Sequence, residues 1–484
     1  MHFASMTRTS MRFGASLAVV VLMGTFISVA AEQGDTEKKI TELETRIAEL
    51  EAALKTLQAG SSVYGPSDAI ELRRRLDLLA AEIASIQLGE AAARRDLKPV
   101  HGLGPGASRV YGAAKGVSIG GYGEALYEDF KARDDSGGPS GKIDRFDFLR
   151  GVLYAGYKFS DRIIFNSEIE FEHASTGKGG EVSLEFAYLD FLLNEHANVR
   201  AGMVLVPAGF INELHEPPVF LGARRPDVER RILPATWREN GVGVFGDAGP
   251  FTYRAYILAG LDSAGFSAAD AVRGGRQSGA QSKAEDLAFT ARMDFTGVPG
   301  LLAGVFFYHG EADQGRLAPI GVDPNGLPTG LETMDAAVTV HDFHAEYRAR
   351  GLDLRALYAE GRINDSKSVN DAGSLTGSGS IAERFFGWYA QAGWDVLSLR
   401  PASAQSLTPF VRHEAFNTQD RVSSHTPRTG APFSANPAND VRILTYGIVY
   451  KPVFNVSIKV DWQNFRNEAN SGVDQFSLSI GYLF

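Results

Sequence analysis

The stretch Gln475-Phe476-Ser477-Leu478-Ser479-Ile480-Gly481-Tyr482-Leu483-Phe484 ends the chain. Large apolar or aromatic side chains stand at 476, 478, 480, 482 and 484, and polar residues or glycine stand between them. This period of two is typical of a β-strand with one apolar and one polar face. A strand that crosses a membrane in a barrel needs about ten residues of this kind. The pattern therefore predicts a barrel strand with one face toward lipid.

A closing strand that ends in phenylalanine resembles the C-terminal signature of bacterial outer-membrane β-barrels. The alternative is a soluble β-sandwich, but the pattern recurs along the chain at the spacing of a barrel. Sixteen segments are predicted as strands, near 117–130, 146–158, 162–173, 181–193, 198–206, 237–247, 251–261, 285–295, 301–310, 335–347, 351–361, 382–396, 407–417, 440–450, 454–464 and 473–484.

Short and long connections alternate between these segments. Tight links such as Tyr450-Lys451-Pro452-Val453 carry turn residues, whereas links such as 207–236 and 418–439 are long. A barrel with small periplasmic turns and large external loops produces this alternation. We therefore predict an all-β chain that forms a sixteen-stranded antiparallel transmembrane β-barrel over residues 117–484. An even strand number brings both ends of the barrel to the periplasmic side.

The predicted strands separate charged from apolar side chains. Val456, Ile458, Val460 and Trp462 alternate with Lys459, Asp461 and Gln463, and the acids Glu168, Glu170 and Glu172 share one face of another strand. Charges are costly against lipid and cheap against a water-filled lumen, so we expect a wet lumen. The three acids offer an alternative cation site, but a solvated pore wall is the simpler interpretation.

The N-terminal part carries an export signal and helices. Residues 1–31 contain Arg8 and Arg12 followed by an apolar run and small residues, which predicts a cleaved signal peptide; an uncleaved membrane helix is the alternative. Residues 32–96 are predicted as a periplasmic coiled-coil and helical segment, with apolar residues at heptad positions from Ile40 to Leu57. Residues 97–116, rich in glycine, proline and alanine, are predicted as a linker.

The coiled-coil segment gives conflicting hints about oligomeric state. Isoleucine at a with leucine at d favours two strands, whereas Arg46-Ile47-Ala48-Glu49-Leu50-Glu51 resembles the trimerisation pattern of short coiled coils. Because the predicted barrel resembles trimeric porins, we expect a homotrimer embedded in outer-membrane lipid, with a periplasmic envelope contact through the coiled coil.

Composition argues against several functions. The chain has no cysteine and a net charge of −10, and loss of the two arginines of the signal peptide makes it more acidic, which argues against a nucleic-acid partner. Gly120-Gly121-Tyr122-Gly123 lies in a strand pattern with no helix after it, so it is not a nucleotide-binding fingerprint. No serine and histidine stand at a spacing that indicates catalysis. We expect no enzyme activity, no cofactor and no metal.

The third long loop, residues 207–236, is rich in apolar residues and prolines, so we expect it to fold inward. In general porins the third external loop narrows the barrel in this way. The sequence Pro234-Ala235-Thr236-Trp237-Arg238-Glu239-Asn240-Gly241-Val242-Gly243 resembles the phosphate-selective porin O/P family. The N-terminal coiled coil is similar to that of DcaP-like trimeric channels. The loop contains no lysine cluster, so the resemblance does not carry one over and leaves phosphate specificity open.

Arginines are the candidate solute contacts, because a guanidinium in a narrow constriction binds carboxylate or phosphate with two hydrogen bonds. Arg224, Arg225, Arg230 and Arg231 lie in the loop, and Arg238, Arg254 and Arg292 extend a basic ladder along the wall. The alternative is that these arginines pair with Glu213, Glu216, Asp227 and Glu229 and only brace the loop. His215 has no metal-ligand or triad spacing beside it, so we expect a structural role.

These observations predict an outer-membrane diffusion porin for small hydrophilic solutes, with a preference for small anions such as phosphate or carboxylates. The alternative is a barrel that acts mainly as an envelope anchor or tether through its coiled coil, with a plugged pore.

Overall fold

A closed antiparallel barrel forms the described part of the chain in the computed structural model, which covers residues 100–484 except 114, 324–327, 401–404 and 429. The predicted signal peptide and the predicted coiled-coil and helical segment lie outside the described residues. The barrel strands are β1 (Gly116–Phe130), β2 (Arg145–Lys158), β3 (Ile163–Glu172), β4 (Val182–Phe191), β5 (Asn198–Leu205), β6 (Arg238–Ala248), β7 (Phe251–Ala259), β8 (Leu287–Phe295), β9 (Leu301–Gly310), β12 (Val338–Ala349), β13 (Leu352–Ile363), β14 (Ala382–Trp394), β15 (Ser406–Val422), β16 (Asp440–Val453), β17 (Val456–Asn467) and β18 (Gln475–Leu483).

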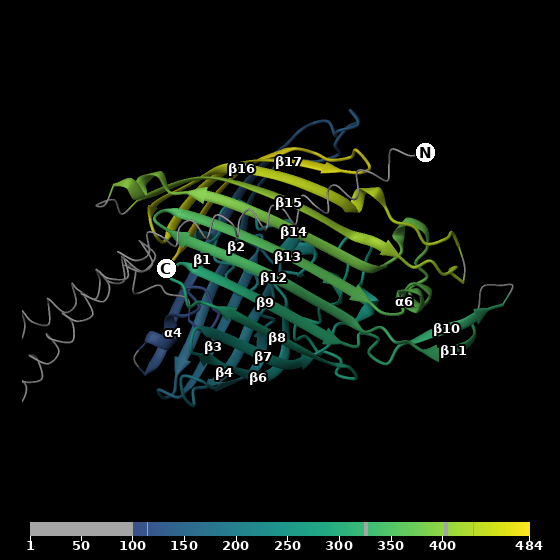
Figure 1. The fold of residues 1–484 in the computed structure, drawn as a ribbon, viewed down its shortest axis with the longest axis horizontal. Coiled ribbons are helices and arrows are strands. Elements are labelled where there is room, and N and C mark those ends of the chain that lie inside the picture. Colours follow the sequence, from purple (N-terminus) through teal and green to yellow (C-terminus); the bar gives the residue numbers. More distant parts are fainter. Residues whose placement is uncertain (1–99, 114, 324–327, 401–404, 429) are drawn as a thin grey trace, which may run out of the picture. The chain divides into compact units, whose positions relative to one another are not determined.

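Each barrel strand pairs with its neighbours in sequence, and β1 pairs with β18 to close the ring. The closing register joins Tyr122 to Leu483 and Phe130 to Gln475. Short turns gather at one end of the barrel and long loops at the other, which Figure 1 shows on the left and right respectively. The predicted sixteen-stranded antiparallel barrel is confirmed.

Two departures from the predicted strands occur at the long-loop end. The hairpin β10 (Leu317–Val322) and β11 (Pro328–Thr333) forms a separate two-stranded sheet inside the predicted loop 311–334. Prolines and glycines hide its alternation, and its register shifts near Pro319. β15 continues five residues past its predicted end at 417, because its polar residues still pair with β14 up to Val422.

Short helices punctuate the loops. They are α4 (Arg109–Gly112), α5 (Asp227–Arg231), α6 (Ser366–Ala372), η3 (Pro217–Val219), η4 (Ser263–Gly265), η5 (Arg273–Gly275), η6 (Gly377–Gly379), η7 (Val396–Leu399) and η8 (Pro437–Asn439). Within the described residues, none of these helices is long and apolar enough to cross a membrane.

The strands separate their side chains between the two faces of the wall. Leu444, Tyr446 and Ile448 on β16 point outward and are 38%, 47% and 48% exposed, whereas Thr445 between them is fully buried. On β17, Lys459, Asp461 and Gln463 face inward, as the alternation predicts. These inward charges are buried under other parts of the chain, so much of the barrel interior is packed protein.

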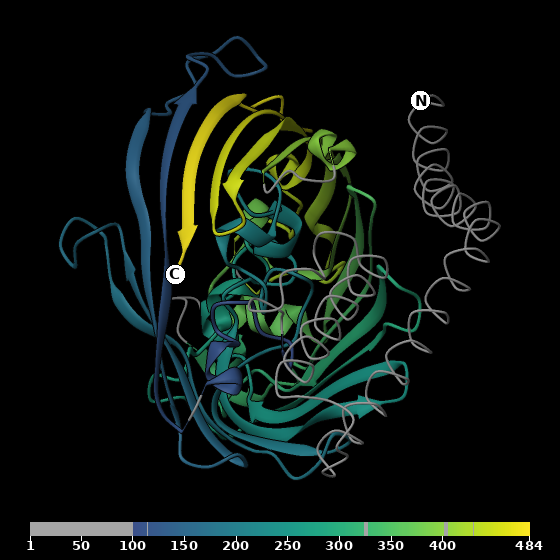
Figure 2. The same cartoon turned by 90° about the vertical axis from the view of Figure 1, so that its left-hand side faces the viewer.

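Residues 100–113, which the sequence places in a linker, occupy the short-turn end of the barrel interior. α4 contacts β1, β2 and β3, and Leu103, Ala107 and Val110 are buried. Figure 2 shows this end, with α4 inside the ring of strands. The close fit requires glycine at position 106, where a Cβ atom would lie 2.6 Å from the Leu483 side chain.

Candidate functional site

The connection between β5 and β6, residues 206–237, folds into the barrel. Apolar side chains from its whole length are buried, among them Phe210, Phe220 and Ile232. Trp237 is fully buried where the loop rejoins the wall. Burial of large apolar side chains stabilises this path by roughly 1.5–3 kcal/mol for each one.

Acids hold the backbone of this loop in place. Glu229 accepts hydrogen bonds from the backbone N–H groups of Phe210 (2.8 Å) and Ile211 (2.6 Å) and from the Tyr389 hydroxyl (2.6 Å). From the wall, Asp342 accepts a hydrogen bond from the backbone N–H of Gly209 at 2.9 Å. Because an acid of α5 and an acid of the wall satisfy consecutive backbone donors at 209–211, this part of the loop has a fixed conformation inside the barrel.

Basic side chains of the wall hold the same loop by its carbonyls. Lys459 donates to the Gly222 carbonyl at 2.9 Å, and Lys451 donates to the Pro218 carbonyl at 2.6 Å. Arg412 donates to the Leu221 carbonyl at 3.2 Å. Several inward charges of the wall therefore position the loop instead of facing open water.

A cavity of about 810 Å³ lies beside the loop, toward the long-loop end. Its lining holds eight basic and four acidic side chains, so it carries an excess of positive charge. The basic residues are Lys142, Arg145, Arg150, Arg224, Arg225, Arg230, Arg231 and Arg273, and the acids are Glu124, Glu128, Glu172 and Asp227.

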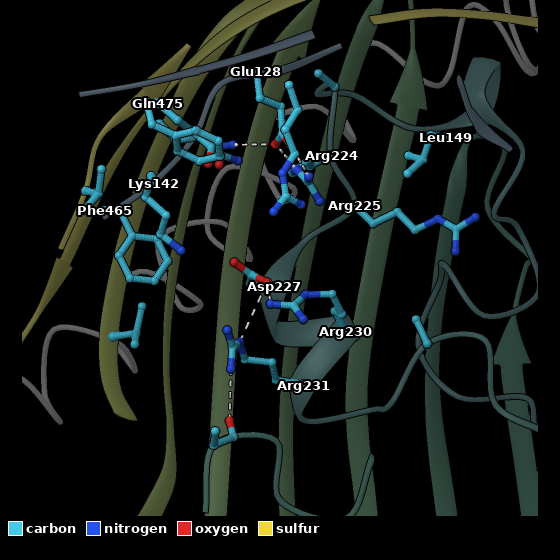
Figure 3. Close-up of a pocket in the computed structure, with 18 of the residues that line it drawn as sticks. Glu128, Lys142, Leu149, Arg224, Arg225, Asp227, Arg230, Arg231, Phe465 and Gln475 are labelled. Carbon is cyan, nitrogen blue, oxygen red and sulfur yellow. Dashed lines mark hydrogen bonds and ion pairs between the residues drawn. The ribbon is translucent and has the colours of Figure 1, made fainter. Parts of the chain in front are cut away.

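The four predicted loop arginines all line this cavity (Figure 3). Arg224 forms an ion pair with Glu128 on β1. Arg230 pairs with Asp227 at 2.6 Å, and Arg231 lies 3.0 Å from Asp270 and 3.9 Å from Asp227. Arg230 and, at a longer distance, Arg231 thus contact Asp227 of their own loop, as the bracing alternative expects. Arg224 instead pairs with the barrel wall, and the shorter contact of Arg231 is to a second loop.

Arg225 differs from the other three. One of its terminal nitrogens donates to the His215 carbonyl at 3.3 Å. Its buried Nε has no hydrogen-bond partner among the described residues, which is also true of Arg231 Nε. Among the described residues, no acid forms an ion pair with Arg225.

The three wall arginines lie away from the cavity. Arg238 pairs with Glu185 at 2.8 Å. Arg254 lies 3.0 Å from Glu213 and 2.9 Å from Asp294, and Arg292 lies 2.8 Å from Asp294. The structure therefore brings Arg254 and Arg292 together around two acids beneath the loop, where they brace it.

Arg273 is a cavity residue that the sequence did not single out. It stands in η5, in the long connection between β7 and β8, and donates to the carbonyls of Arg230 (2.9 Å) and Ala235 (2.8 Å). Burial, with the nearby charges of Arg276 and Arg230, lowers the pKa of Arg273 to about 9. Nothing in its local sequence distinguishes it from other loop arginines, because its place depends on contact with a second loop.

His215 and the acidic face of β3 are paired with each other and with neighbours. His215 Nε2 lies 3.0 Å from Glu168, and its Nδ1 lies 3.0 Å from the Asn212 carbonyl. Glu170 lies 3.3 Å from Arg150. Across the described ranges, no group of three or more histidine, aspartate and glutamate side chains has the arrangement of a metal site.

The N-terminal segment contacts the loop at the short-turn end. The Glu216 carboxylate accepts hydrogen bonds from the backbone N–H groups of Gly106 (2.8 Å) and Ala107 (3.1 Å) and from the Tyr154 hydroxyl (3.1 Å). Asn166 donates to the Ala107 carbonyl at 2.9 Å, and the Tyr111 hydroxyl donates to Asp190 at 2.6 Å. The loop and this segment thus fill neighbouring parts of the lumen.

The fold and the cavity define the class of the protein: a closed sixteen-stranded β-barrel with an inward-folded loop and a basic cavity. The chain belongs to one family with an uncharacterized protein of Aquifex aeolicus (strain VF5). The two are 34% identical over 408 residues, which are 80% of this chain and 84% of that protein. No established family model matches the chain.

Solved structures with a similar course of the chain include outer-membrane channels. The DcaP channel of Acinetobacter baumannii shows a TM-score of 0.47 at 14% identity, over 76% of this chain and 97% of that one. OprB of Pseudomonas putida shows 0.49 at 11% identity, over 76% and 94% of the two chains. The anion-selective porin from Comamonas acidovorans shows 0.45 at 11% identity, over 76% and 99%.

Proposed function

We propose that this protein is an outer-membrane diffusion porin for small hydrophilic solutes, with a preference for small anions such as phosphate or carboxylates. The observation that carries the proposal is the basic excess in the cavity enclosed by the barrel wall and its inward loop. Guanidinium groups in a narrow, poorly hydrated passage attract anions and repel cations more strongly than they do in bulk water.

The outer face of the barrel supports a place in the membrane. Large apolar side chains are exposed around the wall, as on β8, where Leu287, Phe289 and Met293 are 58%, 47% and 49% exposed. Exposure of this apolar surface to water is unfavourable, whereas contact with the lipid of a membrane is favourable. The export signal predicted from the sequence agrees with an outer-membrane location and a periplasmic N-terminal extension. Of the two hints in the coiled-coil pattern, the motif at 46–51 agrees with a homotrimer.

The packed interior favours a second candidate function. Because the loop 206–237 and residues 100–113 both fill the lumen, the barrel also suits an envelope anchor whose periplasmic coiled coil holds a partner. Such an anchor needs no open passage. The two functions therefore differ in whether ions cross the purified protein.

Planar bilayers test the proposal directly. The purified mature chain should insert from detergent and give stepwise conductance in KCl, and a KCl gradient should give a reversal potential on the chloride side. Replacement of Arg224, Arg225, Arg230 and Arg231 by alanine should move that potential toward the potassium side. A matched variant removes the same charge outside the cavity, at Arg162, Arg362, Arg421 and Arg442, which are exposed.

Three outcomes would count against the proposal. Absence of open-channel steps from correctly folded protein would favour the anchor. A reversal potential on the potassium side would remove the anion preference. An equal shift in the loop variant and the matched variant would show that the loop arginines do not carry that preference.

A further inference from the structure

The basic side chains of the cavity fall into three groups by their contacts. Arg224, Arg230 and Arg231 are paired with acids, and Arg150 lies 3.4 Å from Glu124. Lys142 and Arg145 are exposed at the rim, where water hydrates and screens their charge. Arg225 and Arg273 are half-buried, and no ion pair with an acid joins either of them within the described part of the chain.

The half-buried pair has an unusual electrostatic position. Charged groups withdrawn from water need an opposite charge or hydrogen-bond acceptors to offset the loss of hydration. Backbone carbonyls offset part of the lost hydration of both residues. Arg225 donates to the His215 carbonyl, and Arg273 donates to the carbonyls of Arg230 and Ala235. These carbonyls are neutral, and the acids that interact with the two arginines, Glu170 with Arg225 and Asp270 with Arg273, form no direct ion pair with them. The positive charge of this pair is therefore less fully compensated than that of the directly paired arginines.

The same carbonyls fix where each guanidinium lies. Arg273 uses Nη1 for both of its described hydrogen bonds, and Arg225 uses Nη2 for its one. A guanidinium has five N–H donors in a planar fork, so each side chain keeps donors for another acceptor. The two arginines come from different connections, 206–237 and 260–286, and line the same cavity.

From this arrangement we propose that Arg225 and Arg273 are the anion-binding residues of the cavity, and that they take a compact oxyanion, a carboxylate or phosphate group. Arg224, Arg230 and Arg231 hold the loop and the wall together and do not select the solute. This inference rests on the proposed anion preference and narrows it to two named side chains.

The lowered pKa of Arg273 agrees with the assignment. Its causes are burial first and then the positive charges of Arg276 and Arg230, with Arg225 among the further contributors. An anion bound beside Arg273 would relieve the repulsion among these groups. Inorganic phosphate is a suitable probe, because its oxygens match the guanidinium fork.

The test measures how inorganic phosphate inhibits the chloride current through single channels in planar bilayers. In R225Q and in R273Q, the phosphate concentration for half-inhibition should rise about tenfold or more, as expected when a charge-assisted hydrogen bond is lost. R230Q removes the same charge from the same loop at a paired arginine, and its half-inhibition should change less than about threefold. R273K keeps the charge without the fork and should fall between the wild type and R273Q.

The outcomes separate this inference from the proposed function. If the wild type prefers chloride but R230Q weakens inhibition by phosphate as much as R225Q and R273Q do, the assignment of these two residues is wrong while the anion porin stands. Equal inhibition in the wild type and in the R225Q/R273Q double variant would overturn the assignment in the same way. If the wild type shows no steps or prefers potassium, the proposed function itself fails. Detergent-resistant gel mobility identifies folded variants before recording.

Discussion

Replacement of Glu216 by alanine should release residues 100–113 from the short-turn end of the barrel. The Glu216 carboxylate is the shared acceptor for the backbone N–H groups of Gly106 and Ala107 and for the Tyr154 hydroxyl. All three donors are buried when the segment is docked. In the alanine variant, each of them therefore lacks an acceptor in the docked state.

The structure gives the size of the effect. A buried donor left unsatisfied costs about 1–3 kcal/mol, so three of them weaken docking by at least about 3 kcal/mol. Since about 1.4 kcal/mol is a factor of ten in an equilibrium, the undocked population should rise roughly a hundredfold. Replacement by glutamine keeps an acceptor oxygen of the same reach, so it should change the population by less than about tenfold.

Thiol labelling measures this population, because the natural chain has no cysteine. Val110 is 2% exposed in the docked segment, so a V110C protein should react slowly with a water-soluble maleimide. Adding E216A should raise the labelling rate about a hundredfold. D161C, at a position whose side chain is 84% exposed in a turn at the same end, gives the rate of a freely accessible thiol.

An unchanged labelling rate in V110C/E216A would refute the reasoning, because Glu216 would then not hold the segment. Rapid labelling of V110C alone, at the rate of D161C, would show that the segment does not stay docked even with Glu216 present.

Three further predictions follow from burial and charge. Burial raises the pKa of Glu216 to about 7, although the hydrogen bonds from the backbone N–H groups of Gly106 and Ala107 lower it. Because the pKa is higher when the segment is docked, docking is accompanied by uptake of a proton. Docking should therefore be strongest below the ordinary pKa of a glutamate and weaken as pH rises to about 7. Labelling in the V110C background should accelerate more than tenfold between about pH 5 and pH 8, and E216Q should abolish this dependence. Ile448→Arg on the outer face should destabilise the folded barrel in bilayers by ~2–4 kcal/mol in a urea titration, whereas Thr176→Arg in an exposed loop should have little effect. Arg292→Ala breaks a buried ion pair with Asp294 and should lower the free energy of unfolding by ~3–5 kcal/mol. Gels should show this loss as a lower unfolding temperature. The control Arg362→Ala breaks an exposed ion pair and should cost less than ~1 kcal/mol.

The sequence alone determined the barrel, because its information is local. Alternation between lipid-facing and inward residues has a period of two, so each strand can be recognised within about ten residues, as in 475–484 and 456–463. Short and long connections then gave the strand number and the position of the inward loop. Where local signals conflict, as in the proline-containing hairpin β10–β11, the alternation does not predict the strands.

Only the tertiary structure decided what each charged residue does, because ion pairs join residues far apart in the chain. Arg224 and Arg225 are adjacent in sequence, yet Glu128 on β1 pairs with one and no described acid pairs with the other. Arg273 reaches the cavity from a second loop, and Glu216 holds a segment more than a hundred residues before it. Sequence periodicity fixes which face of a strand a side chain occupies, but its partner across the lumen depends on how the loops fill the closed barrel.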